Sequence, residues 1–223
     1  IVLVLSPIPV SLMLLYPFTK RFTSACHLVL GASLGLAPVG AWVAVRNTAG
    51  MPIARRILLS PDHWPRQSFQ EYGVGWAMLA ELAPWLLGAA VMFWVAGFDV
   101  IYALQDDAFD REQNLHSIPA ALGRTKALWA SRLMHSVSAA LFFAFIYVLT
   151  HPAPLRNGMD VTQYTEVAKW VWAAPCVMLL GIVYQHSLVK PNDLSRVNVA
   201  FFTVNGVISV IFGAIFVAAW LLA

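Results

Sequence analysis

Long apolar blocks separated by short polar connections dominate the pattern of this chain. Six blocks are each long enough to cross a lipid bilayer as a helix, which takes about 20 residues; they cover residues 1–18, 27–45, 76–104, 128–149, 170–189 and 199–223. They lack the strict alternation of polar and apolar positions that would indicate β-strands. In lipid every backbone N–H and C=O needs an internal partner, so we expect helices. The pattern therefore predicts an all-α, polytopic transmembrane helical bundle with about six spans in this chain.

Soluble all-α proteins are the alternative class, and their helices carry polar faces that recur about every 3.6 residues. The block from Phe201 to Ala223 has only three polar side chains, those of Thr203, Asn205 and Ser209. The composition agrees, since 60% of the residues are hydrophobic and 11% are charged, against about 25% charged residues in a typical soluble domain. The sequence therefore indicates a protein whose helices contact the lipid bilayer.

Basic residues set the expected orientation in the membrane. With six spans, three connections share one side, here called side A, and two lie with the C-terminus on side B; side A holds 19–26, 105–127 and 190–198, and side B holds 46–75 and 150–168. Side A, with the first turns of the span after it, carries eight of the 14 lysines and arginines, and side B carries six. The positive-inside rule therefore predicts that side A faces the cytoplasm. Because these cations are scattered among loops, the formal net charge of +3 indicates no nucleic-acid partner.

The longest connection, 46–75, has a core from Pro52 to Pro65 that mixes Ile, Leu and Trp with Arg. This core fits a short amphipathic piece lying along the membrane interface, and it fits an ordinary surface loop equally well. The chain shows no internal repeat, so we expect a single transmembrane domain over residues 1–223.

The end of the third block carries the candidate chemistry. Four carboxylates lie within twelve residues there, and they belong to Asp99, Asp106, Asp107 and Asp110. On a helix the spacing i, i+7, i+11 places Asp99, Asp106 and Asp110 on one face, whereas Asp107 is rotated by about 100° from Asp106. An ionisable side chain inside a membrane span is costly and by default indicates function.

Three like charges on one face repel each other unless a cation holds them together or some of them are protonated. Mg²⁺ binds oxygen ligands, usually one or two carboxylates together with phosphate oxygens. The segment therefore predicts a Mg²⁺ and phosphate site. A solvated acidic loop is the alternative; it accounts for Asp107, Asp110 and Glu112 but not for Asp99, which lies about two turns deeper.

Basic residues gather on the same predicted side as the acidic segment. Lys20 and Arg21 follow the first block, and Arg111 follows the last of the four aspartates. A metal ion can bridge carboxylates to phosphates while Lys and Arg neutralise the remaining phosphate charge, so these cations are candidate diphosphate ligands. Setting the membrane topology is the alternative role, and we assign it to Lys126 and Lys190.

The aromatic and histidine residues near the acidic segment give weaker signals. Tyr102 lies one helical turn from Asp99 and from Asp106, where it either lines the same cavity or packs as an ordinary aromatic. None of the six histidines forms a pair at the i, i+4 spacing of helical metal ligands. We interpret His27 and His186, near span ends, as structural residues with satisfied hydrogen bonds.

The segment Asp99-x₂-Tyr102-Ala103-x₂-Asp106-x₃-Asp110 resembles the second aspartate motif of the UbiA superfamily of intramembrane prenyltransferases. Other segments support this resemblance by their order. Tyr16-Pro17-Phe18-Thr19-Lys20-Arg21 is similar to the end of the family's third span, 28–40 to the fourth span, 115–119 to the segment after the motif, and 190–206 to the last span of bacterial members. The match therefore runs along the whole chain.

The resemblance implies a bundle of about eight or nine helices around a lipid-lined cavity, in which Mg²⁺ and basic residues bind a prenyl diphosphate. Asp106 and Asp110 would be Mg²⁺ ligands, and Asp99 would be a further ligand or an orienting acceptor. The implied substrate-binding residues are Lys20, Arg21, Tyr102 and Arg111. The acceptor would be an aromatic acid, either 4-hydroxybenzoate or a related naphthoate, for ubiquinone or menaquinone synthesis. The implied location is the bacterial inner membrane, with the aspartate motif on the cytoplasmic side.

One departure from the family pattern stands out. The family's first motif, N-D-x-x-D-x-x-x-D on its second span, does not occur here, and the chain starts at Ile1 in what looks like the third span. We therefore expect the first two helices, with half of the metal site, to be missing from this chain, and this fragment alone to be inactive.

Two other classes of function remain as alternatives. A cation-coupled transporter could use Asp99 and Asp106 as an ion site, and such proteins show inverted repeats with interrupted helices, which this sequence lacks. A non-catalytic membrane scaffold would leave the acidic segment unexplained. An aspartate-rich motif upstream of Ile1 would separate the enzyme from both.

Overall fold

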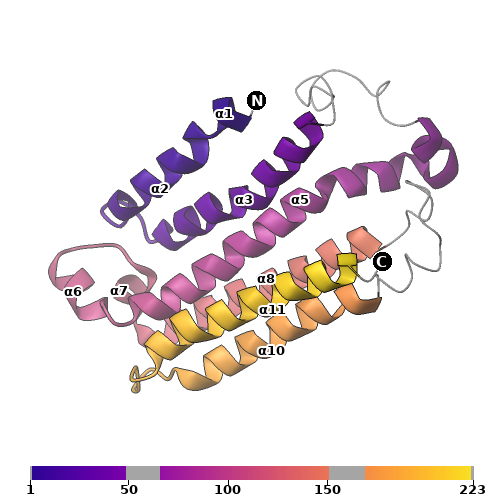
Figure 1. Cartoon of the computed structure of the whole chain (residues 1–223). Helices are drawn as coiled ribbons and strands as arrows, with labels where there is room; N and C mark the ends of the chain where they lie inside the picture. Colours follow the sequence, from indigo (N-terminus) through magenta and orange to yellow (C-terminus); the bar gives the residue numbers. More distant parts are fainter. Residues whose placement is uncertain (1, 49–65, 151–168, 222–223) are drawn as a thin grey trace.

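The computed structural model describes residues 2–48, 66–150 and 169–221, which form a bundle of long helices (Figure 1). Over these residues there is no β-strand, and the predicted all-α class is confirmed. The elements are α1 (Val2–Leu5), α2 (Pro7–Thr19), α3 (Cys26–Thr48), α5 (Arg66–Ala103), α6 (Asp107–Glu112), α7 (Ile118–Leu122), α8 (Arg124–Thr150), α10 (Ala173–Leu188), the π-helical turn η2 (Val199–Val204) and α11 (Asn205–Leu221).

Most predicted blocks are membrane-spanning in length and composition. Among the described residues, five helices are long and apolar enough to cross a bilayer: Cys26–Ala44, Leu82–Ala103, Arg124–Thr150, Lys169–Leu188 and Val199–Ala219. The first block forms a shorter apolar helix, Leu3–Thr19, which is interrupted at Ser6 between α1 and α2. Pro7 begins α2. At the first position of a helix the backbone N–H has no acceptor within the helix, so proline's lack of an N–H costs nothing there. The chain is an integral membrane protein.

The connection predicted over 46–75 is shorter at both ends in the structure. α3 continues to Thr48 and α5 begins at Arg66. Hydropathy marks only the part of a helix that lies in lipid, whereas the backbone hydrogen bonds continue into the polar region beyond it. The core from Pro52 to Pro65, for which two interpretations were open, lies outside the described residues.

Helix α5 runs through the middle of the bundle and packs against α3 on one side and α8 on the other (Figure 1). Gly35 of α3 and Gly88 of α5 meet at the first of these crossings. A Cβ atom placed on Gly35 would lie 2.4 Å from the carbonyl oxygen of Gly88. Small residues at helix crossings in membranes permit such a close approach of two backbones. The path of α3 past α5 therefore depends on these two glycines.

One end of the bundle gathers segments that are distant in the sequence. The turn after α2, the helices α6 and α7, and the turn between α10 and η2 all lie at one end, opposite the C-terminus (Figure 1). This arrangement confirms that the three predicted side-A connections share one side. Beneath them, Val100 and Ile101 of α5 and the adjacent Leu104 pack with Leu128 of α8 and Val197 in a buried apolar cluster. The apolar cluster supports the polar segments above it.

Candidate functional site

Asp99 lies in α5 with only 6% of its surface exposed. Its carboxylate accepts two hydrogen bonds from other helices. The hydroxyl of Tyr16 in α2 lies 3.1 Å from Oδ2 and 3.4 Å from Oδ1, and Nδ1 of His27 in α3 lies 2.6 Å from Oδ2. A carboxylate away from water requires such partners, because burying an unpaired charge in a protein interior costs on the order of several kcal/mol. Asp99 therefore joins α2, α3 and α5.

Asp106 and Asp110 lie beyond the end of α5. Asp106 is at the N-cap position of α6, but its side chain makes no capping hydrogen bond, and it is exposed. The backbone N–H of Asp110 donates to the carbonyl of Asp106 over 2.8 Å, so these two carboxylates lie one helical turn apart, as predicted. The prediction that Asp99 shares one continuous helix with them is wrong, because α5 ends at Ala103 and α6 begins at Asp107. Asp110 is 1% exposed, and its Oδ2 is 3.4 Å from Nζ of Lys20. Lys20 thus reaches the acidic face from the end of α2.

Asp107 points to a different partner, as its rotation on the helix predicted. Arg124, at the start of α8, donates to both carboxylate oxygens of Asp107, with Nε 3.0 Å from Oδ2 and Nη2 2.9 Å from Oδ1. These hydrogen bonds hold the pKa of the Asp107 carboxyl below its usual value of 3.8. Nη2 of Arg111 lies 3.5 Å from the same carboxylate and also donates to the carbonyl of Pro119 over 3.3 Å. Asp107 therefore connects α6 to α8, and its partners differ from those of Asp106 and Asp110.

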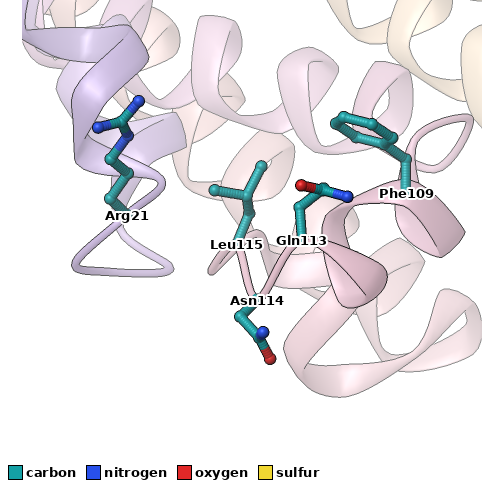
Figure 2. A pocket seen from close by; sticks show the side chains of 5 residues that line it. All are labelled: Arg21, Phe109, Gln113, Asn114 and Leu115. Carbon is teal, nitrogen blue, oxygen red and sulfur yellow. The ribbon is translucent and has the colours of Figure 1, made fainter.

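A pocket of about 430 Å³ opens between the turn after α2 and the end of α6. Its lining residues are Arg21, Phe109, Gln113, Asn114 and Leu115. Figure 2 shows Arg21 on one side and Phe109 with Gln113 on the other. The two walls are joined by a hydrogen bond from the His116 N–H to the Lys20 carbonyl, at 2.6 Å. The pocket combines a guanidinium with an aromatic ring, which suits a planar anion.

The described residues contain no group of three or more His, Cys, Asp or Glu side chains close enough to hold a metal ion by themselves. Two carboxylates are nevertheless suitable for Mg²⁺. Asp106 has no side-chain partner among the described residues, and Asp110 has the long contact with Lys20. Mg²⁺ is usually held by one or two carboxylates, with waters and substrate phosphates completing six positions, so Asp106 and Asp110 fit part of such a shell.

A sequence model of the UbiA prenyltransferase family matches residues 1–207 of this chain. The chain belongs to this family. The family match confirms the resemblance that the aspartate segment carried. It also covers both sides of the site, because Lys20, Arg21 and the acidic residues all lie within the matched range.

Individual UbiA-family relatives agree with this assignment. The 4-hydroxybenzoate octaprenyltransferase of Alcanivorax borkumensis is 29% identical over 183 residues, which are 82% of this chain and 46% of that protein. That of Nitrosomonas europaea is 27% identical over 199 residues, 86% of this chain and 62% of that protein. The apo structure of a UbiA homolog from Aeropyrum pernix K1 matches with a TM-score of 0.66 at 30% identity, over 97% of this chain and 63% of that one. The chain therefore spans between about half and two thirds of the length of these relatives.

The other residues predicted for the UbiA-family site, Arg21, Arg111 and Tyr102, have different surroundings in the structure. Arg21 lines the pocket, whereas Arg111 is bound to Asp107 and Pro119. Tyr102 is half-buried and packs on Phe201 of η2, with ring centroids 4.4 Å apart. Its proposed contact with substrate stays a prediction, since its observed contacts are those of a packing aromatic.

Sequence reasoning did not identify the two partners of Asp99. Tyr16 appeared only as part of a family motif, and His27 was interpreted as structural. Both lie at the side-A ends of the first two apolar blocks, at a depth similar to that of Asp99, and this shared depth was the available signal. The prediction that His186 is satisfied is wrong in part. Its Nε2 lies 2.8 Å from Nδ1 of His135, but its own buried Nδ1 finds no hydrogen-bond partner among the residues that the structure describes.

Proposed function

We propose that the protein containing this chain transfers a polyprenyl group from a prenyl diphosphate to an aromatic acceptor, with Mg²⁺ bound by aspartates. Family membership supports the reaction class. The acceptor we favour is 4-hydroxybenzoate, because the relatives described above are named 4-hydroxybenzoate octaprenyltransferases. A related naphthoate is the second candidate. Either product would belong to quinone biosynthesis, that of ubiquinone or of menaquinone.

The observation that carries this proposal is the pairing of Asp106, at the N-cap of α6, with Asp110 one turn later, and the contact of Lys20 with Asp110. Asp106 is exposed and has no side-chain partner among the described residues, so its charge is available to a metal. Asp110 is buried and in contact with Lys20. A face with two carboxylates and one ammonium group suits a metal–diphosphate complex better than either ion alone, because the carboxylates hold the metal and Lys20 contacts phosphate.

In prenyl transfer the bond between C1 and the diphosphate oxygen breaks, and pyrophosphate leaves with the bonding electrons. The allylic cation is then attacked by the electron-rich ring, which afterwards loses a proton. Bound Mg²⁺ would neutralise charge on the leaving group. Lys20 would hold phosphate oxygens as their charge increases, and Arg21 would hold a phosphate or the carboxylate of the aromatic acid. The apolar helices around the site would exclude water and so protect the cation from hydrolysis.

Side A faces the cytoplasm in this proposal, and the membrane is the bacterial inner membrane. The excess of eight basic residues on side A over six on side B supports the orientation. The bacterial relatives support the type of membrane. With Cys26 and Cys176 replaced by serine, a single cysteine introduced at Asn114, in the pocket wall, would be labelled from the cytoplasmic face by an impermeant maleimide. Labelling from the opposite face would overturn the orientation.

The test of function uses membranes that contain the full-length protein. They are incubated with a radiolabelled prenyl diphosphate and 4-hydroxybenzoate, first with Mg²⁺ and then with EDTA. Mg²⁺-dependent transfer of the label to the aromatic acid is the expected result. Transfer only to a naphthoate would keep the reaction and change the acceptor, whereas no diphosphate chemistry with either acceptor would overturn the proposal.

The transporter alternative receives no support from the comparisons. The matched family is one of prenyltransferases, and the sequence shows no internal repeat of the kind that such transporters carry. Cation uptake into vesicles that contain the protein, lost in an Asp99→Asn variant, would favour the transporter.

A further inference from the structure

We propose that His27 is a positioning residue of this site, which orients Asp99 and couples it to the segment that carries Asp106 and Asp110. The catalytic consequence of this inference rests on the proposed function. Its geometry rests on the hydrogen bonds of the imidazole ring alone. The two parts are tested separately below.

Both nitrogens of the His27 ring are engaged, and the residue is 0% exposed. Nδ1 lies 2.6 Å from Oδ2 of Asp99. Nε2 accepts the backbone N–H of Ile118 over 3.3 Å. An acceptor nitrogen carries no proton, so the neutral ring carries its proton on Nδ1 and donates it to Asp99. The hydrogen bond at one ring nitrogen thus determines whether the other nitrogen is protonated and acts as a donor.

The two partners of His27 lie before and after the segment that carries Asp106 and Asp110, which we call the acidic turn. Asp99 precedes the turn in α5, and Ile118 is the first residue of α7 after it. Within the turn, the N–H of Leu115 donates to the carbonyl of Asp110 over 2.7 Å, so the chain is tied from Asp110 towards Ile118. His27 therefore brackets the segment that presents Asp106 and Asp110, and a change at this ring reaches both ends of the segment.

His27 also decides which oxygen of Asp99 remains available. Oδ2 accepts from His27 and from Tyr16, at 2.6 and 3.1 Å. Oδ1 has the longer 3.4 Å contact with the Tyr16 hydroxyl. The ring thereby turns Asp99 so that Oδ1 keeps acceptor capacity for a group outside the protein, such as a metal-bound water or a phosphate-bound proton.

The first test compares two substitutions in the full-length protein. His27→Leu removes both hydrogen bonds, whereas His27→Gln keeps one donor and one acceptor. Groups that orient a ligand of this kind typically change activity or metal affinity by about 10–100-fold when removed. We expect His27→Leu to lower kcat or raise the Mg²⁺ concentration for half-maximal activity by that factor, with the KM for the aromatic acid within about threefold. His27→Gln should recover most of the loss, and equal losses in both variants would overturn the positioning role.

Ser33→Ala is the matched control for disturbance of α3. Ser33 is buried in the same helix, and its hydroxyl donates to the carbonyl of Leu30 within α3. Because the Ser33 hydroxyl is bonded within its own helix, its variant should keep activity close to that of the wild type. A loss as large as that of His27→Leu would show that any polar change in α3 has this effect and would overturn the proposal.

A double-mutant cycle tests whether His27 acts through Asp99. If it does, His27→Leu should lower kcat/KM at least about 10-fold in the wild type but less than about twofold in an Asp99→Ala background. Full multiplication of the two losses would mean that His27 acts independently of Asp99, and this result would overturn the proposal.

Two measurements do not depend on activity. The side-chain ¹⁵N shifts of His27 should be those of a neutral ring protonated at Nδ1. Hydrogen exchange of the Ile118 amide should be at least about 10-fold faster in His27→Leu than in the wild type or in Ser33→Ala, because the amide loses its acceptor. A proton on Nε2, or unchanged exchange, would overturn the geometry even if prenyl transfer is observed. If prenyl transfer is absent while both results are as expected, the proposed function fails and the coupling remains.

Discussion

The guanidinium of Arg124 and the carboxylate of Asp107 form a two-point ion pair, with N to O distances of 3.0 and 2.9 Å. This pair connects the first residue of α8 to the first residue of α6. It takes Asp107 out of the set of carboxylates that are available to a metal, although Asp107 is the direct neighbour of Asp106. The four aspartates of this segment therefore have different surroundings: Asp99 bonds to Tyr16 and His27, Asp107 to Arg124, Asp110 contacts Lys20, and Asp106 is exposed.

The stability of the protein should depend on the Asp107–Arg124 pair. Asp107→Asn removes the charge and is expected to cost about 1–2 kcal/mol, a value at the low end for a charged hydrogen bond because Arg124 is partly exposed and screened by solvent. This corresponds to a decrease in Tm of about 2–8 °C at pH 7. Thermal melting of the detergent-solubilised protein measures it, and Arg124→Gln should give a similar decrease. An unchanged Tm in both variants would contradict the assignment.

The same pair predicts a pH dependence. The pKa of Asp107 is lowered from its usual 3.8 in the folded protein, so the unfolded chain takes up the proton first as the pH falls. The stabilisation is then fully present above about pH 4 and is lost as the pH falls through the lower, folded pKa. The difference in Tm between the wild type and Asp107→Asn should be constant from pH 7 to about 5 and should shrink below the usual pKa. A difference that grows on acidification would contradict this sign.

Neighbouring aspartates should differ in their effect on turnover. Asp106→Asn and Asp110→Asn are each expected to lower prenyl transfer by at least about 100-fold, because each removes a charge from the metal and diphosphate face. Asp107→Asn should lose less than about 10-fold, since its carboxylate is engaged by Arg124. Transfer of radiolabel in membranes measures all three, with membrane insertion checked by carbonate extraction. Retained activity in both Asp106→Asn and Asp110→Asn would exclude the metal assignment.

Lys20 should act on the donor substrate. Its Nζ lies 3.4 Å from Oδ2 of Asp110, at the face where we place the diphosphate. Lys20→Gln is expected to raise the KM for the prenyl diphosphate about 10-fold, which corresponds to about 1.4 kcal/mol and to the loss of one charged contact. The exposed Lys126, assigned to topology, is the matched control, and Lys126→Gln should leave this KM unchanged. A similar increase in both variants would indicate a general charge effect.

The crossing of α3 and α5 gives a prediction about stability. An alanine Cβ at position 35 would lie 2.4 Å from the Gly88 carbonyl oxygen, whereas a Cβ at position 40 would meet nothing within 4 Å. Gly35→Ala should therefore push the two helices apart and cost about 1–3 kcal/mol, as overpacking does. Gly40→Ala makes the same change in the same helix and should keep the Tm of the wild type. Equal melting temperatures for both variants would show that the crossing tolerates a methyl group.

Features set by local geometry could be read from the sequence. The apolar blocks predicted the spans and the all-α class, because every backbone polar group in lipid must be satisfied within its own helix. Helical periodicity placed Asp106 and Asp110 on one face and turned Asp107 away, and the structure agrees. These results follow from the rise and rotation of one helix, which are the same wherever the helix packs.

Only the tertiary structure decided the partners of the carboxylates. Tyr16 and His27 are 83 and 72 residues from Asp99 along the chain, and Arg124 is 17 residues from Asp107. Which of the many polar residues at the side-A ends would meet depended on how closely α3 passes α5 at Gly35 and Gly88. A contact between helices is set by packing shape in three dimensions, and hydropathy along one dimension carries no record of it.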